Sequence, residues 1–169
     1  MDAWLRGPIE GVPPLLMPVA HALVQTVEDV ERAAGQLGPD ELWARPGGVA
    51  SAGFHLRHIA GVVDRLFTYA RGEALNPEQL SDLRIEEEPG DPPATADTLL
   101  RELRETVDHA LEQLRKTDHD ALLERREVGR KRIPSNVLGL LFHAAEHAQR
   151  HSGQVVVTAR LVPEFSAGS

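Results

Sequence analysis

Four segments of the chain repeat apolar residues at intervals of three and four, and this spacing limits the fold more than any other sequence feature. Such intervals place apolar side chains along one stripe of an α-helix, whereas a half-buried strand alternates with a period of two. The segments cover residues 15–37, 51–70, 96–116 and 136–161. We therefore predict an all-α chain of four long amphipathic helices that bury their stripes against one another.

Residues that cap or end helices mark the limits of these segments. The expected N-caps are Ser51, Thr95 and Ser135, and the expected helix-ending residues are Gly72 and Pro163. Four prolines in the stretch 73–94 predict a long connection with room for one helical turn, because proline removes a backbone donor. We predict an up-down four-helix bundle with this long connection between its second and third helices.

Composition limits the range of functions. The 169 residues fit a single domain, 1–169, and 41% hydrophobic residues is ordinary for a globular protein. The formal net charge of -8 argues against nucleic-acid binding, which normally requires a basic stripe. The basic cluster before the last segment is interpreted as a solvated loop, and it comprises Arg125, Arg126, Arg130, Lys131 and Arg132.

The chain has no cysteine, which excludes disulfides, thiolate nucleophiles and Cys-ligated zinc. Any metal must be held by His, Asp, Glu, backbone or water. No apolar run approaches the roughly 20 residues that span a bilayer, and the N-terminal residues lack the pattern of a signal peptide. We therefore expect a cytoplasmic protein without a membrane partner.

Five of the eight histidines fall in two of the predicted helices, as H-L-R-H at 55–58 and H-A-A-E-H-A-Q-R-H at 143–151. Helix positions four apart are offset by only about 40°, so His147 and His151 project from one face, one turn apart. This spacing lets two imidazoles reach one metal. Both lie on the apolar face, where each unpaired polar group costs about 1–3 kcal/mol. A shared metal would satisfy both rings, as would hydrogen bonds to backbone or to each other.

A third ligand is expected from another helix, where His55 and His58 are the candidates. The apolar arc of segment 51–70 includes His55 more comfortably, whereas His58 lies at its edge, a position that suits a site opening into a cleft. His143 lies further round the face of His147, and we interpret it as a supporting, lining or boundary residue and not as a ligand. The isolated histidines are interpreted as surface or boundary residues, and they are His21, His109 and His119.

Two stretches of sequence resemble a known family, H-I-A-G-V-V-D-R-L at 58–66 and E-H-A-Q-R-H-S-G-Q at 146–154. They are similar to the DinB-like superfamily of metal-binding four-helix bundles, whose relatives include YfiT-type and mycothiol-dependent proteins. In that family a helix-two histidine joins two histidines four apart on the last helix, the second followed by x-Gly-Gln. The resemblance implies that His58, His147 and His151 hold one divalent metal. Ser152 departs from the family, which often has Arg there, so no Arg role is carried over.

Three imidazoles leave a metal with open positions, as in catalytic zinc sites, and both zinc and nickel accept such ligands. No catalytic residue can be assigned: Glu146 and Asp64 lie on polar faces, Gln154 shares the histidine face and Tyr69 suits the lining of a cleft. The resemblance implies a metal-dependent hydrolase or thiol-dependent transferase, with a small-molecule or thiol cosubstrate. The alternatives are a non-catalytic metal-binding or stress-associated bundle, and a structural bundle with core histidines. Each is compatible with a homodimer.

Overall fold

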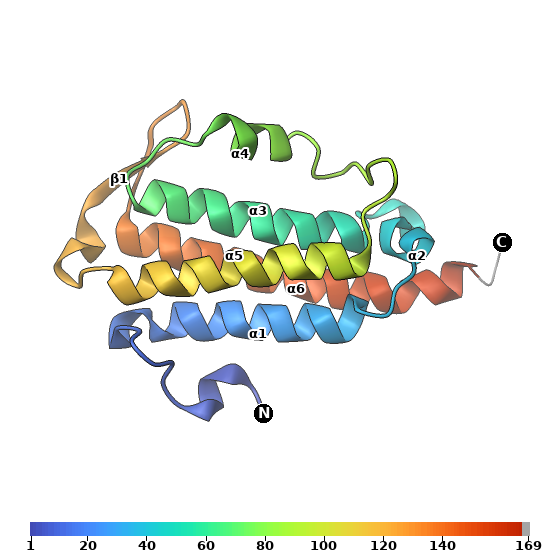
Figure 1. The fold of residues 1–169 in the computed structure, drawn as a ribbon, viewed down its shortest axis with the longest axis horizontal. Helices are drawn as coiled ribbons and strands as arrows, with labels where there is room; N and C mark the ends of the chain where they lie inside the picture. The colour runs from blue at the N-terminus through green and yellow to red at the C-terminus, as the bar shows by residue number, and fades with distance from the viewer. Residues whose placement is uncertain (167–169) are drawn as a thin grey trace.

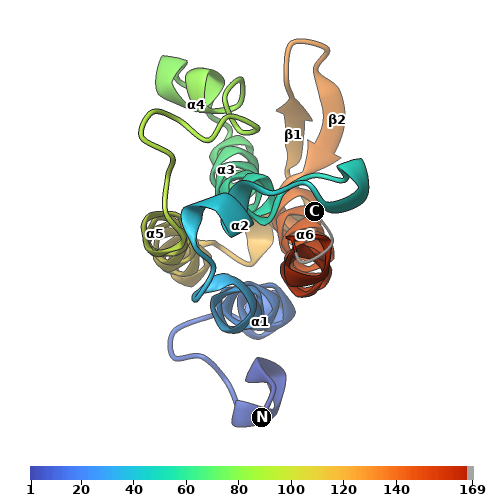
Figure 2. The ribbon, with the colours of Figure 1, turned by 90° about the vertical axis from the view of Figure 1, so that its right-hand side faces the viewer.

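Four long helices dominate the protein. The computed structural model describes the backbone of residues 1–166 and the side chains of residues 1–162. The long helices are α1 (Met17–Ala34), α3 (Ala52–Ala70), α5 (Ala96–Lys116) and α6 (Val137–Ser166). They lie along the long axis of the molecule (Figure 1), and the view down that axis shows them at four corners around a common centre (Figure 2). The mostly helical fold that the periodicity predicts is therefore confirmed.

Short elements occupy the connections between these helices. They are α2 (Pro39–Trp43), α4 (Pro77–Asp82), the 3-10 turns Ala3–Arg6, Pro14–Leu16, Pro46–Gly48 and Asp120–Leu123, and the strands β1 (Arg125–Val128) and β2 (Ile133–Asn136). The helix α4 is the turn that the long proline-rich connection allows. Its N-cap Asn76 accepts a hydrogen bond from the Gln79 N–H, and the Gln79 side chain accepts one from the Asn76 N–H.

The connector with the basic cluster forms a β-hairpin, so the fold is not strictly all-α. The predicted solvated loop holds for the turn at 130–132 and is wrong for Arg125 and Arg126, which lie in β1. β1 pairs antiparallel with β2, with Val128 opposite Ile133. Gly129 (φ 64°) and Arg132 (φ 49°) take left-handed backbone angles between the strands, and such angles reverse the chain with the twist that a hairpin needs. The apolar alternation that usually signals strands is too short here to be read.

Side-chain caps begin two of the helices as predicted. The Ser51 hydroxyl accepts a hydrogen bond from the Phe54 N–H at the start of α3, and the Thr95 hydroxyl accepts one from the Thr98 N–H at the start of α5. Gly72 follows α3 with a φ of 80°, the left-handed conformation expected there. Local hydrogen-bonding chemistry therefore sets these boundaries.

Both ends of α6 differ from the prediction. Ser135 lies in β2, and the side chain of Asn136 caps the helix by accepting a hydrogen bond from the Gly139 N–H at 2.7 Å. The helix continues to Ser166 and so passes Pro163. A proline removes one backbone donor but keeps a φ compatible with helix, so it need not be the last residue.

The two middle helices run in the same direction, which corrects the predicted up-down alternation. Arg71, just after α3, donates a hydrogen bond to Gln113 in the last turns of α5. At the other end, the Trp43 indole packs on Gly53 in the first turn of α3 and donates to the carbonyl of Ala94, just before α5. α3 and α5 are therefore parallel, while α1 and α6 run the opposite way (Figure 1). The connection 71–95 allows this because extended residues reach about 3.3 Å each, enough to return along α3.

The core lies between the four helices. α1 packs along α5 and α6, and α3 packs along the same two helices, so α1 and α3 face each other across the bundle. Fully buried side chains include Leu23, Ile59, Leu103 and Leu141, one from each long helix, and each contributes about 1.5–3 kcal/mol on burial. In the described part of the chain, no helix combines the length and hydropathy required for a bilayer span. The interface of α3 with α6 carries the histidines.

Candidate metal centre

Three histidines from two helices meet between α3 and α6. His58 Nε2 lies 3.0 Å from His147 Nε2. The ring centroid of His151 lies 4.5 Å from that of His58 and 4.6 Å from that of His147. One nitrogen from each of the three rings lies within 4.8 Å of the other two. The structure thus brings together the three histidines that the family resemblance singled out.

These distances suit one small divalent ion. Imidazole nitrogens bind zinc at about 2.0–2.1 Å, so two ligands of a tetrahedral ion lie about 3.4 Å apart. The 3.0 Å between His58 Nε2 and His147 Nε2 is close to that separation. In addition, His147 Nδ1 is buried and has no hydrogen-bond partner among the described residues. Three imidazole nitrogens grouped in this way form a set of donors that fits one cation. With Nε2 of His147 as the ligand, its Nδ1 takes no part in binding that ion.

His55 contacts one member of this group, His151, and is itself buried. It is 5% exposed, and its Nδ1 lies 3.0 Å from Nδ1 of His151. This contact uses Nδ1 of His151 and leaves its Nε2 available to a metal. The helical wheel favours His55 as the third member of the group, but in the structure it is His58 that groups with His147 and His151. Both His55 and His58 face α6, and His58 lies against both α6 rings, whereas His55 contacts that of His151.

A buried carboxylate from the long connection orients His58. Glu86 is 5% exposed, and its Oε2 accepts a hydrogen bond from His58 Nδ1 at 2.6 Å, which turns Nε2 of that ring toward His147. Burial opposes ionisation of Glu86, but the hydrogen bond from His58 and the charge of Arg65 outweigh it and hold the Glu86 pKa below its usual value. Metal-binding histidines commonly have such a carboxylate on their second nitrogen.

Arg65 neutralises the buried charge of Glu86, and Gly61 leaves room for the pair. Arg65 Nη2 lies 2.7 Å from Glu86 Oε1, and both side chains are almost fully buried. A Cβ at position 61 would lie 2.5 Å from Arg65 Nη1 and 2.8 Å from Glu86 Oε1. A glycine inside a helix costs about 1 kcal/mol relative to alanine. Here that glycine leaves the space in which the ion pair lies against α3.

We expect Gly61→Ala to destabilise the protein by about 1–3 kcal/mol despite the better helix propensity of alanine, because the new methyl group displaces a buried ion pair. Gly153→Ala in α6 is the matched control, since a Cβ there meets nothing within 4 Å. That control should stabilise by about 0.5–1 kcal/mol. Urea denaturation of both variants measures the difference, and two changes of the same sign would contradict this role for Gly61.

The segment 83–94, here named the strap, is fastened to α3 around Glu86. Arg57 Nη1 donates to the carbonyl of Ile85 at 3.0 Å and also to the carbonyl of Glu88. The Arg57 guanidinium lies 5.0 Å from the ring of Trp43, a cation–π contact. The strap therefore has attachments on both sides of Glu86. Sequence reasoning missed this residue because three consecutive glutamates give no signal that one of them is buried.

Lowered pKa values favour the neutral form, which a metal requires, in His147 and His151 and in the adjacent His55. Burial, followed by the proximity of His58, lowers the pKa of His55 to about 4. Burial, followed by His58 and His147, lowers the pKa of His151 to about 4. The pKa of His147 is also lowered, first by burial and then by His58.

The other α6 candidates lie outside the group. Glu146 pairs with Arg150 and with His143 at 2.9 Å, which is the surface role expected of Glu146. His143 is exposed, and its ring borders that of His147 at 5.5 Å, so it is a boundary residue and not a member of the group. Gln154 is exposed, so its predicted place on the histidine face does not bring it into the cluster. Ser152, which replaces the arginine often found in the family, is 3% exposed.

The remaining candidates lie on other surfaces of the molecule. Asp64 accepts a hydrogen bond from Gln79 and is exposed. Tyr69 lines a pocket beside the hairpin, at the opposite end of α3 from His55 and His58. Among the isolated histidines, His21 contacts the carbonyl of Gly7 at 2.9 Å, outside the core.

Comparison with known proteins assigns the family. The model of the DinB superfamily matches residues 22–155 of this chain, a stretch that contains His58, His147 and His151. The chain belongs to the DinB superfamily. No curated protein matches it. A solved structure, described as the conserved protein of a locus from Enterococcus faecalis, shares 21% sequence identity with a TM-score of 0.71, over 88% of this chain and 97% of that chain. This likeness supports the DinB-like fold, and the three-histidine group is compatible with a metal site.

Proposed function

We propose that this DinB-superfamily chain holds one divalent metal ion, zinc or nickel, through His58, His147 and His151, and that it is a metal-dependent enzyme of the hydrolase or thiol-dependent transferase type. The observation that carries the proposal is the grouping of one nitrogen from each histidine within 4.8 Å. Neutral imidazoles accept either metal. The buried Glu86 and His55 occupy the second nitrogens of two of the rings, the arrangement that orients ligands toward a shared ion.

Three protein ligands characterise catalytic sites, in which a divalent ion supplies Lewis acidity at its open positions. The side chain of His58 is 18% exposed, so the group is not sealed from solvent. Phe54 stacks on the His58 ring at 5.2 Å and closes one side against water. A small carbonyl compound with a thiol cosubstrate is the substrate class that we propose for this arrangement.

A second candidate function is metal binding without catalysis. It is favoured by the contacts of Glu86, which occupy both of its carboxylate oxygens. Glu86 is the buried carboxylate of the cluster, and its two oxygens face His58 and Arg65. Neither is therefore free to act as a general base. Glu146 is engaged at the surface. The homodimer, the cytoplasmic location and the thiol cosubstrate stay predictions under either function.

Elemental analysis of the purified protein tests the metal site directly. We expect about one ion per chain in the native protein and less than about a tenth of that in His151→Ala, because loss of one of three ligands removes much of the binding free energy. His109→Ala is the matched control, since His109 is an exposed histidine on α5. It should retain the native metal content. Absence of metal from the native protein after reconstitution with zinc or nickel, or equal content in both variants, would refute the proposal.

Activity measurements separate the two candidate functions. Metal-loaded protein is tested with low-molecular-weight thiols and with generic ester and amide substrates, beside metal-free protein and His151→Ala. Turnover that depends on both the metal and His151 supports the enzyme. A blank result from a protein with stoichiometric metal supports binding without catalysis.

A further inference from the structure

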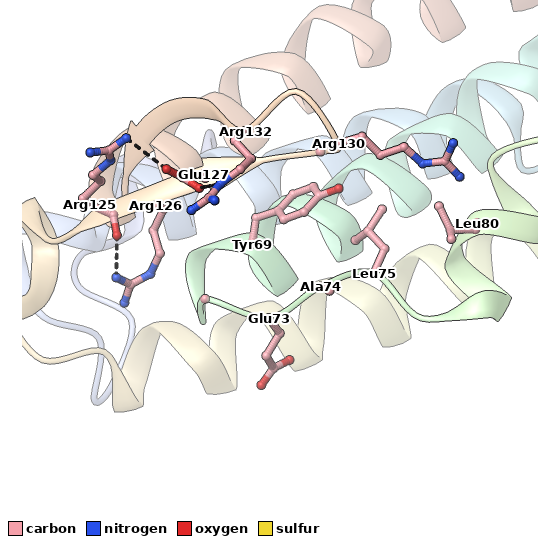
Figure 3. Close-up of a pocket in the computed structure, with 12 residues that line it drawn as sticks. Tyr69, Glu73, Ala74, Leu75, Leu80, Arg125, Arg126, Glu127, Arg130 and Arg132 are labelled. Carbon is pink, nitrogen blue, oxygen red and sulfur yellow. Dashed lines mark hydrogen bonds and ion pairs between the residues drawn. The ribbon is translucent and has the colours of Figure 1, made fainter.

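A second concave site lies at the far end of α3 from the histidines. It has a volume of about 720 Å³ and lies between the C-terminal end of α3, the beginning of the connection 71–95 and the β-hairpin (Figure 3). Tyr69 on its wall is 11 positions from His58, about 16 Å along the helix. The two sites have no residue in common, and the volume suits a small organic ligand.

The hairpin wall of this pocket is basic in a chain whose net charge is -8, but most of its arginines are already engaged. Arg125 and Arg132 both pair with Glu127. Arg126 pairs with Glu124 and donates a further hydrogen bond to a backbone carbonyl of α3. The left-handed backbone of Arg132 (φ 49°) is uncommon for this residue type, and it accompanies the contact that holds Glu127. Glu127 is thereby occupied by two cations.

Arg130 is the cation on this wall that has no acidic partner among the described residues. Figure 3 shows its side chain extending along the pocket, with its guanidinium on the side where Leu80 lies. The Tyr69 hydroxyl end is turned toward the same side and also has no hydrogen-bond partner in the described structure. The apolar surface beneath them comes from the Tyr69 ring, Leu75 and Leu80. An unpaired guanidinium and a hydroxyl thus lie next to an apolar floor.

We propose that this pocket binds a small amphipathic monoanion, a carboxylate on a hydrocarbon or aryl body. The planar Arg130 guanidinium matches the two oxygens of a carboxylate, and the Tyr69 O–H can donate a further hydrogen bond. The apolar body then covers Leu75 and Leu80, removing their exposed surface from water. Arg130 is the guanidinium of this wall without an acidic partner among the described residues, and one guanidinium matches one carboxylate.

Octanoate is the probe for this proposal, and its titration into the ¹⁵N-labelled protein is followed by NMR. We expect saturable shifts confined to residues 69–80 and 125–132. Octanol and octylammonium carry the same chain without the negative charge, so they should bind at least about tenfold more weakly. Arg130→Gln should weaken octanoate binding by about tenfold. Lys131→Gln is the matched control, because Lys131 is the next exposed residue of the hairpin and does not line the pocket.

Three outcomes would overturn the proposal. The first is no saturable octanoate binding at millimolar concentration. The second is equal affinity for octanoate and octanol, or equal affinity in Arg130→Gln and Lys131→Gln. The third is a set of shifts centred on His58, His147 and His151, which would mean that octanoate binds at the histidine cluster. None of these results depends on whether the metal proposal is correct.

Discussion

His58→Ala is expected to lower the affinity for zinc or nickel by about two to three orders of magnitude. This loss should exceed that caused by His55→Ala, the same substitution at the neighbouring histidine. Zinc binding to a structural site with four ligands has a free energy of about 10–16 kcal/mol, roughly 2.5–4 kcal/mol per ligand, and 1.4 kcal/mol is tenfold in affinity. His55→Ala should cost only about 10–100-fold, the usual effect of removing a group that orients a ligand. The reason is geometric. His58 Nε2 faces Nε2 of His147, whereas His55 contacts Nδ1 of His151 and so leaves Nε2 of that ring for the metal.

Competition with a chromophoric chelator measures both affinities. Glu86→Gln provides an internal check, since Glu86 contacts the metal group only through His58 Nδ1. It should lower affinity by about 10–100-fold in the native background and have no further effect in His58→Ala. A larger loss for His55→Ala than for His58→Ala would show that His55 is the third ligand.

Arg65→Met is expected to lower the free energy of unfolding by about 3–5 kcal/mol, the largest effect on stability that we predict. The substitution leaves Glu86, which is 5% exposed, with a buried charge and without the guanidinium 2.7 Å away. Arg101→Met is the matched control, because the Arg101 side chain is 56% exposed and lies 3.8 Å from Asp97. A surface pair of that kind contributes at most about 0.5 kcal/mol.

Urea denaturation of the metal-free proteins measures both changes. The double variant Arg65→Met with Glu86→Gln should recover much of the loss, because it removes the unpaired charge as well as its partner. If Arg65→Met alone stays within about 1 kcal/mol of the native protein, the ion pair is not what holds the strap in place.

Much of the helical framework could be predicted from sequence because its causes are local. Apolar spacing defined the four long helices, and the hydroxyls of Ser51 and Thr95 cap their own helices three residues on. The direction of α5 relative to α3 was predicted wrongly, because it depends on the path of the whole connection 71–95. The hairpin was missed because four-residue strands give too little alternation to read.

By itself, the sequence determined that His147 and His151 share a helix face, since residues four apart in an α-helix are nearly aligned whatever surrounds them. Only the tertiary structure decided that His58 lies against both of them while His55 contacts His151, and that Glu86 lies behind His58. The contacts of His58 with His147 and Glu86 join residues 89 and 28 positions apart. Helical geometry gives the offset of residues on one helix, but the packing of α3 on α6 and the course of the strap select which side chains from distant segments meet.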